Sequence, residues 1–157
     1  MATFTNYQPG LGKVGQYQMS GIPFASSSIA VTSSDVSSVA TKIEFPYVTK
    51  FVTVINTHAG TNAPMRVGFS DRGIYDTSNL SHGDGNNSYY FVLNNGESYT
   101  GEWRISELYL LGDESATPAT ASVIAGLTFI DTGRISAISG TLNDGSGANW
   151  SGSIGVG

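Results

Sequence analysis

Short runs of β-branched and aromatic residues recur along the middle of this chain, and turn residues separate them. Between residues 24 and 130 the turn signals return roughly every eight to twelve residues, a spacing typical of β-sandwiches. No window repeats apolar residues at helical spacing with good helix formers. This pattern predicts an all-β chain that folds as a single antiparallel β-sandwich of about seven or eight strands.

The predicted strands differ in how strongly the sequence marks them. Residues 48–56 carry β-branched or aromatic side chains at nearly every position, which favours the centre of a sheet. Asn95-Gly96 is the residue pair most typical of a tight hairpin. The strand number fits a jelly-roll-like sandwich best, and an immunoglobulin-like sandwich is the alternative. The predicted strands are residues 24–32, 39–45, 48–56, 65–70, 89–93, 97–101, 103–111 and 121–130.

The two ends of the chain have a different composition from this body. Residues 1–23 place apolar residues among glycines and glutamines, with Lys13 as their one charge, and residues 131–157 are rich in Gly and Ser. We therefore expect an extended N-terminal arm at 1–23, a β-sandwich domain at 24–130 and a Gly/Ser-rich C-terminal extension at 131–157. The arm residues predicted to bind a partner are Tyr7, Leu11, Val14, Tyr17 and Met19.

Charge and cysteine content exclude several classes of function. Charged residues make up 12% of the 157 residues, about half the usual share, and the net charge is −5. The seven Lys and Arg residues are scattered singly, so we expect no nucleic-acid partner. No run of about eighteen apolar residues occurs, so we expect no membrane partner either. The absence of cysteine excludes disulfides, thiolate metal sites and cysteine nucleophiles.

Residues 10–15 read G-x-G-x-x-G, the pattern with which dinucleotide-binding folds hold a pyrophosphate. That use needs a strand before the glycines and a helix after them. Neither the preceding TNYQP nor the following QYQMSG fits. The glycines therefore indicate joints in an extended arm, and no cofactor is expected.

Catalytic patterns are weak in this sequence. No G-x-S-x-G nucleophile elbow occurs, and any Ser-rich chain offers Ser, His and Asp in some combination. Glu97, Glu102 and Glu107 could in principle supply paired carboxylates for glycoside hydrolysis. The simpler interpretation of Glu107 is a pairing with an Arg or exposure at a sheet edge. We expect the chain not to be an enzyme.

Residues 71–88 form a long polar stretch of about eighteen residues, and loops of that length are often functional. Tyr75, Asp76, His82 and Asp84 make it a candidate surface-recognition loop for a cation or a glycan. Turn propensity also explains these residues, because the calcium-loop pattern is absent, so no metal is assigned to them. A second candidate for sugar binding is an aromatic platform, with core packing as the competing interpretation. Its residues would be Tyr75, Tyr89, Tyr90, Tyr99 and Trp103.

The order of segments across residues 25 to 130 resembles that of a known group of proteins. The segments are RVGFS at 66–70, YFVL at 90–93, NGESY at 95–99, ELYL at 107–110 and SVIAGLT at 122–128. This order resembles small β-sandwich structural proteins of double-stranded DNA virus particles, the decoration (cement) or minor capsid proteins of tailed bacteriophages and marine viruses. The resemblance implies a virion component that binds the major capsid shell, and it carries over no catalytic residue.

The resemblance and the composition together give one leading functional expectation. We expect a non-enzymatic capsid decoration protein that stabilises the shell, assembled into the virion in the host cytoplasm. Its partners would be the major capsid protein and further copies of itself, as a homo-oligomer such as a trimer. One alternative is a tail, baseplate or fibre component that recognises a host surface. Another is a secreted carbohydrate-binding module.

Overall fold

The computed structural model describes residues 21–34, 39–60, 62–70, 73–75, 90–113 and 118–134. These residues form eight β-strands, and their one helical element is the short 3-10 turn η2 (Thr132–Arg134). None of the described helical residues forms a segment that could span a membrane. The strands are β1 (Ile22–Val31), β2 (Thr41–Glu44), β3 (Tyr47–Asn56), β4 (Met65–Gly68), β5 (Tyr90–Leu93), β6 (Ser98–Gly101), β7 (Glu107–Gly112) and β8 (Ala119–Asp131).

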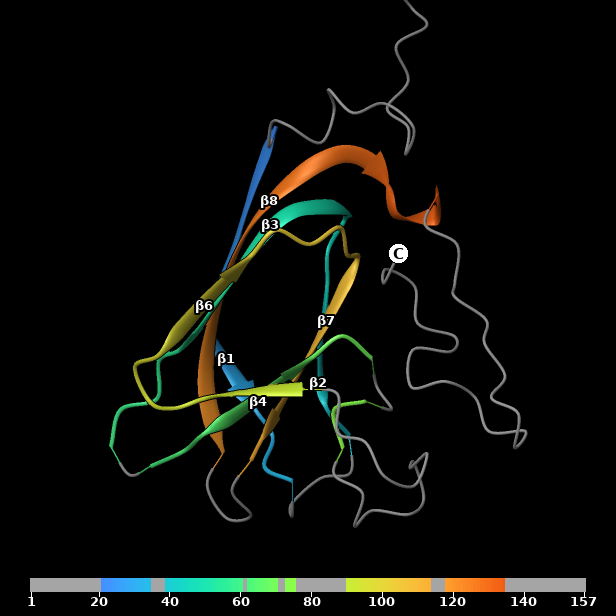
Figure 1. Ribbon diagram of the computed structural model, residues 1–157. Coiled ribbons are helices and arrows are strands. Elements are labelled where there is room, and N and C mark those ends of the chain that lie inside the picture. The colour runs from blue at the N-terminus through green and yellow to red at the C-terminus, as the bar shows by residue number, and fades with distance from the viewer. Residues whose placement is uncertain are drawn as a thin grey trace, which may run out of the picture.

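The strands pair into two four-stranded antiparallel sheets (Figure 1). Sheet A has the order β1-β8-β3-β6, and sheet B has the order β2-β7-β4-β5. Figure 1 shows the two sheets as opposite layers, with the chain passing repeatedly from one to the other. The predicted all-β sandwich is therefore confirmed.

The strand pairing is nested: the first strand pairs with the last, and each following strand pairs with the one before its predecessor's partner. Strand β1 pairs with β8, β2 with β7, β3 with β6 and β4 with β5. Two further pairings, β3 with β8 and β4 with β7, join these pairs into the two four-stranded sheets. The long central strands β3 and β8 therefore hold sheet A together, as the apolar run at 48–56 predicted.

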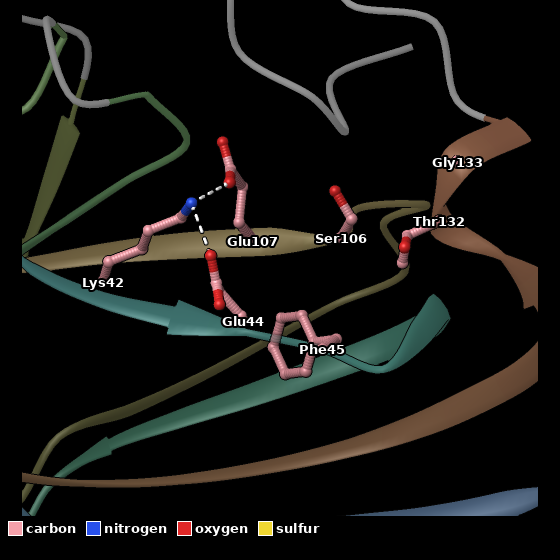
Figure 2. A pocket seen from close by; sticks show the side chains of 7 residues that line it. All are labelled: Lys42, Glu44, Phe45, Ser106, Glu107, Thr132 and Gly133. Carbon is pink, nitrogen blue, oxygen red and sulfur yellow. Dashed lines mark ion pairs between the residues drawn. The ribbon is translucent and has the colours of Figure 1, made fainter.

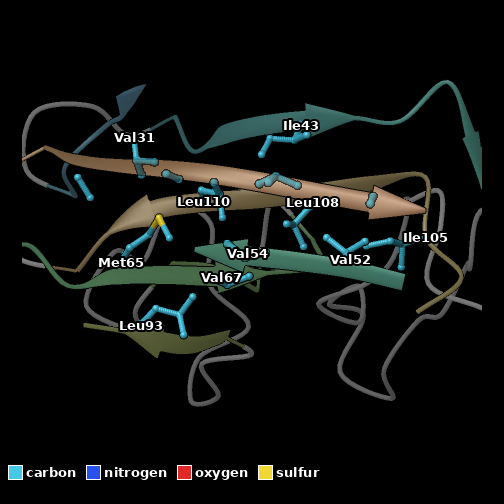
Figure 3. Packing of buried hydrophobic residues seen from close by; sticks show 14 of the residues in the cluster. Val31, Ile43, Val52, Val54, Met65, Val67, Leu93, Ile105, Leu108 and Leu110 are labelled. Carbon is cyan, nitrogen blue, oxygen red and sulfur yellow. The ribbon is translucent and has the colours of Figure 1, made fainter. Parts of the chain in front are cut away.

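The core lies between the two sheets and consists of side chains from alternate strand positions (Figure 3). Val52 and Val54 of β3 meet Val67 of β4 and Leu108 and Leu110 of β7, all of them fully buried. Burying a side chain of this size stabilises the fold by roughly 1.5–3 kcal/mol before entropy is counted. Because strand side chains alternate between faces, the residues between these positions face outward from the sandwich.

The chain crosses from sheet A to sheet B between β6 and β7, where the sequence predicted one continuous strand at 103–111. Strand β7 begins only at Glu107. Thr49 of β3 holds the crossing segment, because its hydroxyl donates to the Trp103 carbonyl at 2.6 Å and accepts from the Ile105 amide at 3.1 Å. Trp103 and Ile105 consequently pack with the core, whereas Glu107 faces outward. The strand predicted at residues 103–111 is therefore wrong for residues 103–106, which form the crossing segment.

The last part of β8 bends away from the flat region of sheet A (Figure 1). The register between β3 and β8 shifts on both sides of Thr49. The Thr128 hydroxyl donates to the Val48 carbonyl at 2.8 Å, and Val48 packs with Ile130 in a small buried cluster. This bend brings η2 close to the start of β7, and a pocket lies between them.

Candidate functional site: two unlike sheet faces and an aromatic edge

Part of the outer face of sheet A is a set of uncharged residues that crosses all four strands. One row follows the strand register from Ala25 on β1 through Ile124 on β8 and Thr53 on β3 to Thr100 on β6. The Thr53 and Thr100 hydroxyls are 2.8 Å apart and hydrogen-bonded. We call this surface the neutral face. Its residues are Pro23, Ala25, Phe51, Thr53, Ile55, Ser98, Thr100, Ser122, Ile124 and Gly126.

Apolar side chains on the neutral face are accessible to a partner. Ile124, at its centre, keeps 44% of its surface exposed, although β-branched apolar residues in a sheet are usually buried. Ala25 and Pro23 are exposed, and Phe51 and Ile55 are half-buried. None of the residues of this face carries a charge, so a partner could cover it without removing a charged group from water.

The outer face of sheet B is different, because charged groups and a second apolar cluster occupy it. Residues 73–75 lie against it, with Ile74 and Tyr75 packed on Tyr109 and Leu111 of β7. The Tyr75 hydroxyl accepts a hydrogen bond from the Ala40 amide at 2.8 Å, and Tyr75 is 8% exposed. Tyr75 therefore occupies a core position, not the exposed position that the recognition-loop hypothesis gave it. Asp76, His82 and Asp84 lie outside the described residues.

Arg66 is a buried charged residue on the same outer face. It projects from β4, is 7% exposed and pairs with the Asp113 carboxylate just after β7. Its guanidinium also lies 4.6 Å from the ring centre of Tyr90, in cation–π geometry. These contacts account for a buried arginine without a ligand.

A pocket of about 310 Å³ lies where β2, β7 and η2 meet, and an ion-pair cluster forms one side of it (Figure 2). The Lys42 ammonium is 2.8 Å from the Glu44 carboxylate and 2.7 Å from that of Glu107. Tyr109 donates its hydroxyl to the other Glu107 oxygen at 3.1 Å. Because Glu44 and Glu107 are cross-strand partners in register, Lys42 separates two carboxylates that would otherwise repel each other.

The electrostatics of this cluster suit a structural ion pair better than acid–base chemistry. The hydrogen bonds that the Lys42 ammonium donates, to Glu107 first and to Glu44 second, raise the pKa of Lys42 above its usual range. The hydrogen bond from Lys42 lowers the pKa of Glu44. A general acid carboxyl needs a raised pKa and a catalytic lysine a lowered one, so both shifts run in the opposite direction. Figure 2 shows Ser106 and Thr132 on the far side of the pocket from the ammonium.

The three carboxylates that the sequence suggested for glycoside hydrolysis do not form a common site. Glu97 closes the hairpin between β5 and β6 by accepting hydrogen bonds from the amide and side chain of Asn94. Glu102 is exposed after β6, and Glu107 is bound to Lys42 and Tyr109. The partner of Glu107 is thus a lysine, and the predicted arginine is wrong.

An aromatic cluster fills the gap between the sheets at the edge formed by β5 and β6. The rings of Tyr99 and Trp103 are stacked, with centres 5.5 Å apart and planes 13° apart. Phe91 lies 5.0 Å from Tyr99, and Phe69 lies edge-on to Trp103 at 4.7 Å. Tyr99 is 47% exposed, whereas the other three are half-buried. We call these four residues the aromatic edge.

The structure brings together only part of the aromatic platform that the sequence suggested. Tyr99 and Trp103 meet at the aromatic edge, but Tyr90 lies on the outer face of sheet B and Tyr75 is in its buried cluster. Tyr89 and the arm residues Tyr7, Leu11, Val14, Tyr17 and Met19 lie outside the described residues.

Sequence reasoning missed the neutral face and the Lys42 cluster. Alternation in residues 48–56 and 121–130 is a signal for the neutral face, because the positions between the buried ones carry no acidic or basic group at 51, 53, 55, 122 and 124. Lys42 and Glu107 are far apart in the sequence, so only the pairing of β2 with β7 reveals their contact.

Two further observations bear on what the chain can bind. Among the described residues, no group of three His, Cys, Asp or Glu side chains could hold a metal ion. No family model, curated protein or solved structure matches the chain. Function therefore has to be argued from the surfaces of the chain itself.

Proposed function

We propose that this chain is a structural protein of a virus particle, a capsid decoration protein that docks on other proteins through the neutral face. The observation that carries the proposal is the contrast between the two outer sheet faces. Sheet B covers the apolar residues at the centre of its outer face with residues 73–75 and carries paired charges, although Val92 of the edge strand β5 stays 39% exposed. Sheet A leaves Ile124, Phe51 and Ile55 accessible on a surface without charge. Accessible apolar residues that are gathered on one face are typical of protein interaction sites.

The arrangement of the strands supports the same proposal. Nested pairing of eight strands, with four in each sheet, is what results when one long antiparallel hairpin is rolled into a sandwich. We propose that the sandwich is a jelly roll, a fold found in viral capsid proteins and in lectins and cupins. Fold alone does not decide among these uses, so the neutral face is what favours the structural role.

The host-recognition and carbohydrate-binding alternatives are favoured by a different observation, the half-exposed Tyr99 stacked on Trp103. A sugar ring could stack on the exposed part of Tyr99. The aromatic edge nevertheless fits core closure better, because Phe91, Tyr99 and Trp103 pack against one another between the sheets. A glycan array probed with the chain and with Tyr99→Ala tests these alternatives. Tyr99-dependent binding would support them, and binding to no glycan would remove their support.

A direct test of the structural role is to mix the purified chain with empty shells of the major capsid protein from the genome that carries this chain, which the proposal requires to be a viral genome. The chain should pellet with the shells and saturate at a fixed ratio to the capsid protein. It should also raise the temperature at which the shells come apart, because a ligand that binds only the assembled state stabilises that state. The proposal is contradicted if the chain does not pellet with the shells even when its concentration equals that of the shells.

A further inference from the structure

The neutral face raises the question of which protein surface covers it. A four-stranded face with strands about 4.8 Å apart and about six residues long measures roughly 19 Å by 20 Å, or about 400 Å². A stable interface needs about 800 Å² from each partner. Two neutral faces packed against each other would therefore provide only about half of what a stable dimer needs, and a longer contact has to supply the rest.

Residues 1–20 have the length and the composition to supply that contact. An extended chain of this length reaches roughly 66–72 Å, several times the width of the face. Lys13 is its one charged residue, and it carries Phe4, Tyr7, Leu11, Val14, Tyr17 and Met19 as apolar side chains. An almost uncharged segment and an uncharged face can come together without a desolvated ion. Hydroxyls of Ser98, Thr100 and Ser122 offer hydrogen bonds to the main chain of an extended segment.

The point at which this segment joins the sandwich indicates which copy of the face it can reach. The Gly21 amide donates to the Leu127 carbonyl at 3.0 Å, so the chain enters sheet A along the line of its edge strand β1. The Phe129 ring lies against Gly21, and a side chain at that position would overlap it. An arm that continues in the direction of β1 leaves the sandwich and reaches a neighbouring copy without turning, whereas return to the face of the same copy requires a reversal of direction.

We propose that the neutral face is occupied by the N-terminal arm, residues 1–20, of a second copy of this chain. The inference rests on the proposed function of the face as a docking surface and names its partner. Each copy then gives an arm to one neighbour and receives an arm from another, a head-to-tail contact that closes into a ring when the rotation permits. Such a ring would place several copies on the shell at once and multiply the strength of their attachment.

The absence of native cysteine makes a direct test possible. One differently tagged set of full-length chains carries a single cysteine in the arm, at Tyr7, Leu11, Val14 or Tyr17. A second set carries Thr53→Cys on the neutral face, or Val92→Cys on the outer face of sheet B as the matched control. After mixing and mild oxidation, at least one arm position should form a heterodimer with Thr53→Cys and none with Val92→Cys. The inference is overturned if no arm position forms that heterodimer, or if a chain with both cysteines closes on itself as a monomer at high dilution.

Oligomer mass provides a second measurement that does not depend on cross-linking. Light scattering should show an oligomer for the full-length chain and for Val92→Lys, and a monomer for Ile124→Lys at the same concentration. Introduction of a charge into the covered face should weaken association at least tenfold. Circular dichroism shows whether Ile124→Lys is folded, and Thr53→Lys serves as a second variant if it is not. A monomeric native chain that still pellets with shells would overturn this inference and leave the proposed function standing. An arm-exchanged oligomer that does not pellet with the shells would leave this inference standing and contradict the proposed function.

Discussion

At the residue scale, Asn56 is a buried side chain that connects several segments of the chain. It ends β3, is fully buried and donates to the carbonyls of Ala63 at 2.8 Å and Leu93 at 3.0 Å. Its side-chain oxygen accepts from the His58 amide at 3.1 Å. A single amide group thus satisfies three main-chain groups from three segments, which a buried position requires.

Asn56→Asp should be strongly destabilising at neutral pH. The carboxylate cannot donate to the two carbonyls, and a charge would be buried beside their oxygens, so we expect a loss of roughly 3 kcal/mol in the free energy of unfolding. Burial raises the pKa of the introduced carboxyl, so the penalty should shrink as acid protonates it and restores one donor. Urea unfolding at pH 7 and pH 4 measures this, with the exposed Asn62→Asp as the control. An equal penalty at both pH values would contradict the hydrogen-bonding role.

Lys42 is the second residue whose role can be tested by pH. Its raised pKa contributes stability that is fully present below the usual value of 10.5 and is lost only as the pH rises through the higher value in the folded state. The lowered pKa of Glu44 contributes stability that is present above 4.5 and is lost as the pH falls through the folded value. The contribution of the Lys42–Glu44 pair should therefore be constant from about pH 4.5 to 10.5.

Lys42→Met should lower the free energy of unfolding at pH 7 by roughly 1 kcal/mol, a modest amount because the lysine is partly exposed. The loss should decrease toward pH 3, because the stability that Lys42 contributes through its contact with Glu44 is itself lost as the pH falls through the lowered pKa of Glu44. Thermal unfolding of the variant and the native chain across this range provides the measurement. Lys42→Met/Glu44→Gln should recover part of the loss at pH 7, and a loss that is the same at pH 3 and pH 7 would rule out the electrostatic explanation.

At the scale of the elements, strand positions could be predicted well because period-two alternation and turn residues are local signals. The run at 48–56 lies in β3 (Tyr47–Asn56), and the Asn95-Gly96 turn joins β5 to β6, with Gly96 at a φ of +76°. The predicted strand at 103–111 failed because alternation does not show where a chain leaves one sheet for another. The point of crossing is determined by the hydrogen bonds of Thr49 to Trp103 and Ile105, and Thr49 is more than fifty residues away from them in the sequence.

The same locality explains which site residues were predictable. Tyr99 and Trp103, two of the five residues suggested for the aromatic platform, are close in sequence and stack on each other in the structure. Tyr75 was grouped with its polar neighbours, yet its hydroxyl is bound to the Ala40 amide from a different part of the chain. The neutral face needs the register of four strands, and only the assembled sheet supplies it.

Gly101→Ala tests the aromatic edge as an element that closes the sandwich. A methyl group at this position would overlap the Trp103 ring, so either the ring or β6 has to move. Overpacking of this kind should cost about 1–3 kcal/mol and expose Trp103 to solvent. Urea unfolding followed by tryptophan fluorescence should show lower stability and a red-shifted native emission. Ser98→Ala in the same strand should change neither, and a Gly101→Ala variant with native stability would show that the edge is not tightly packed.

At the scale of the whole molecule, the two sheets differ in what their outer faces present to a partner. Sheet B carries an apolar cluster and ion pairs on its outer face and leaves Val92 exposed there, so its outer face is charged where that of sheet A is neutral. Sheet A shares the core but presents the neutral face, and β1 joins that sheet to the N-terminal arm. This difference is what makes a docking role a property of one face and not of the sandwich in general.

The measurement that tests the proposed role most directly compares one charge placed on each outer face, with shells of the major capsid protein from the same genome as the binding target. Ile124 and Val92 are both β-branched strand residues with similar exposure, 44% and 39%. Ile124→Lys on the neutral face should reduce the amount of chain that pellets at least tenfold, whereas Val92→Lys on sheet B should pellet as the native chain does. Equal pelleting of the two variants, with both folded by circular dichroism, would contradict the claim that the neutral face is the assembly surface.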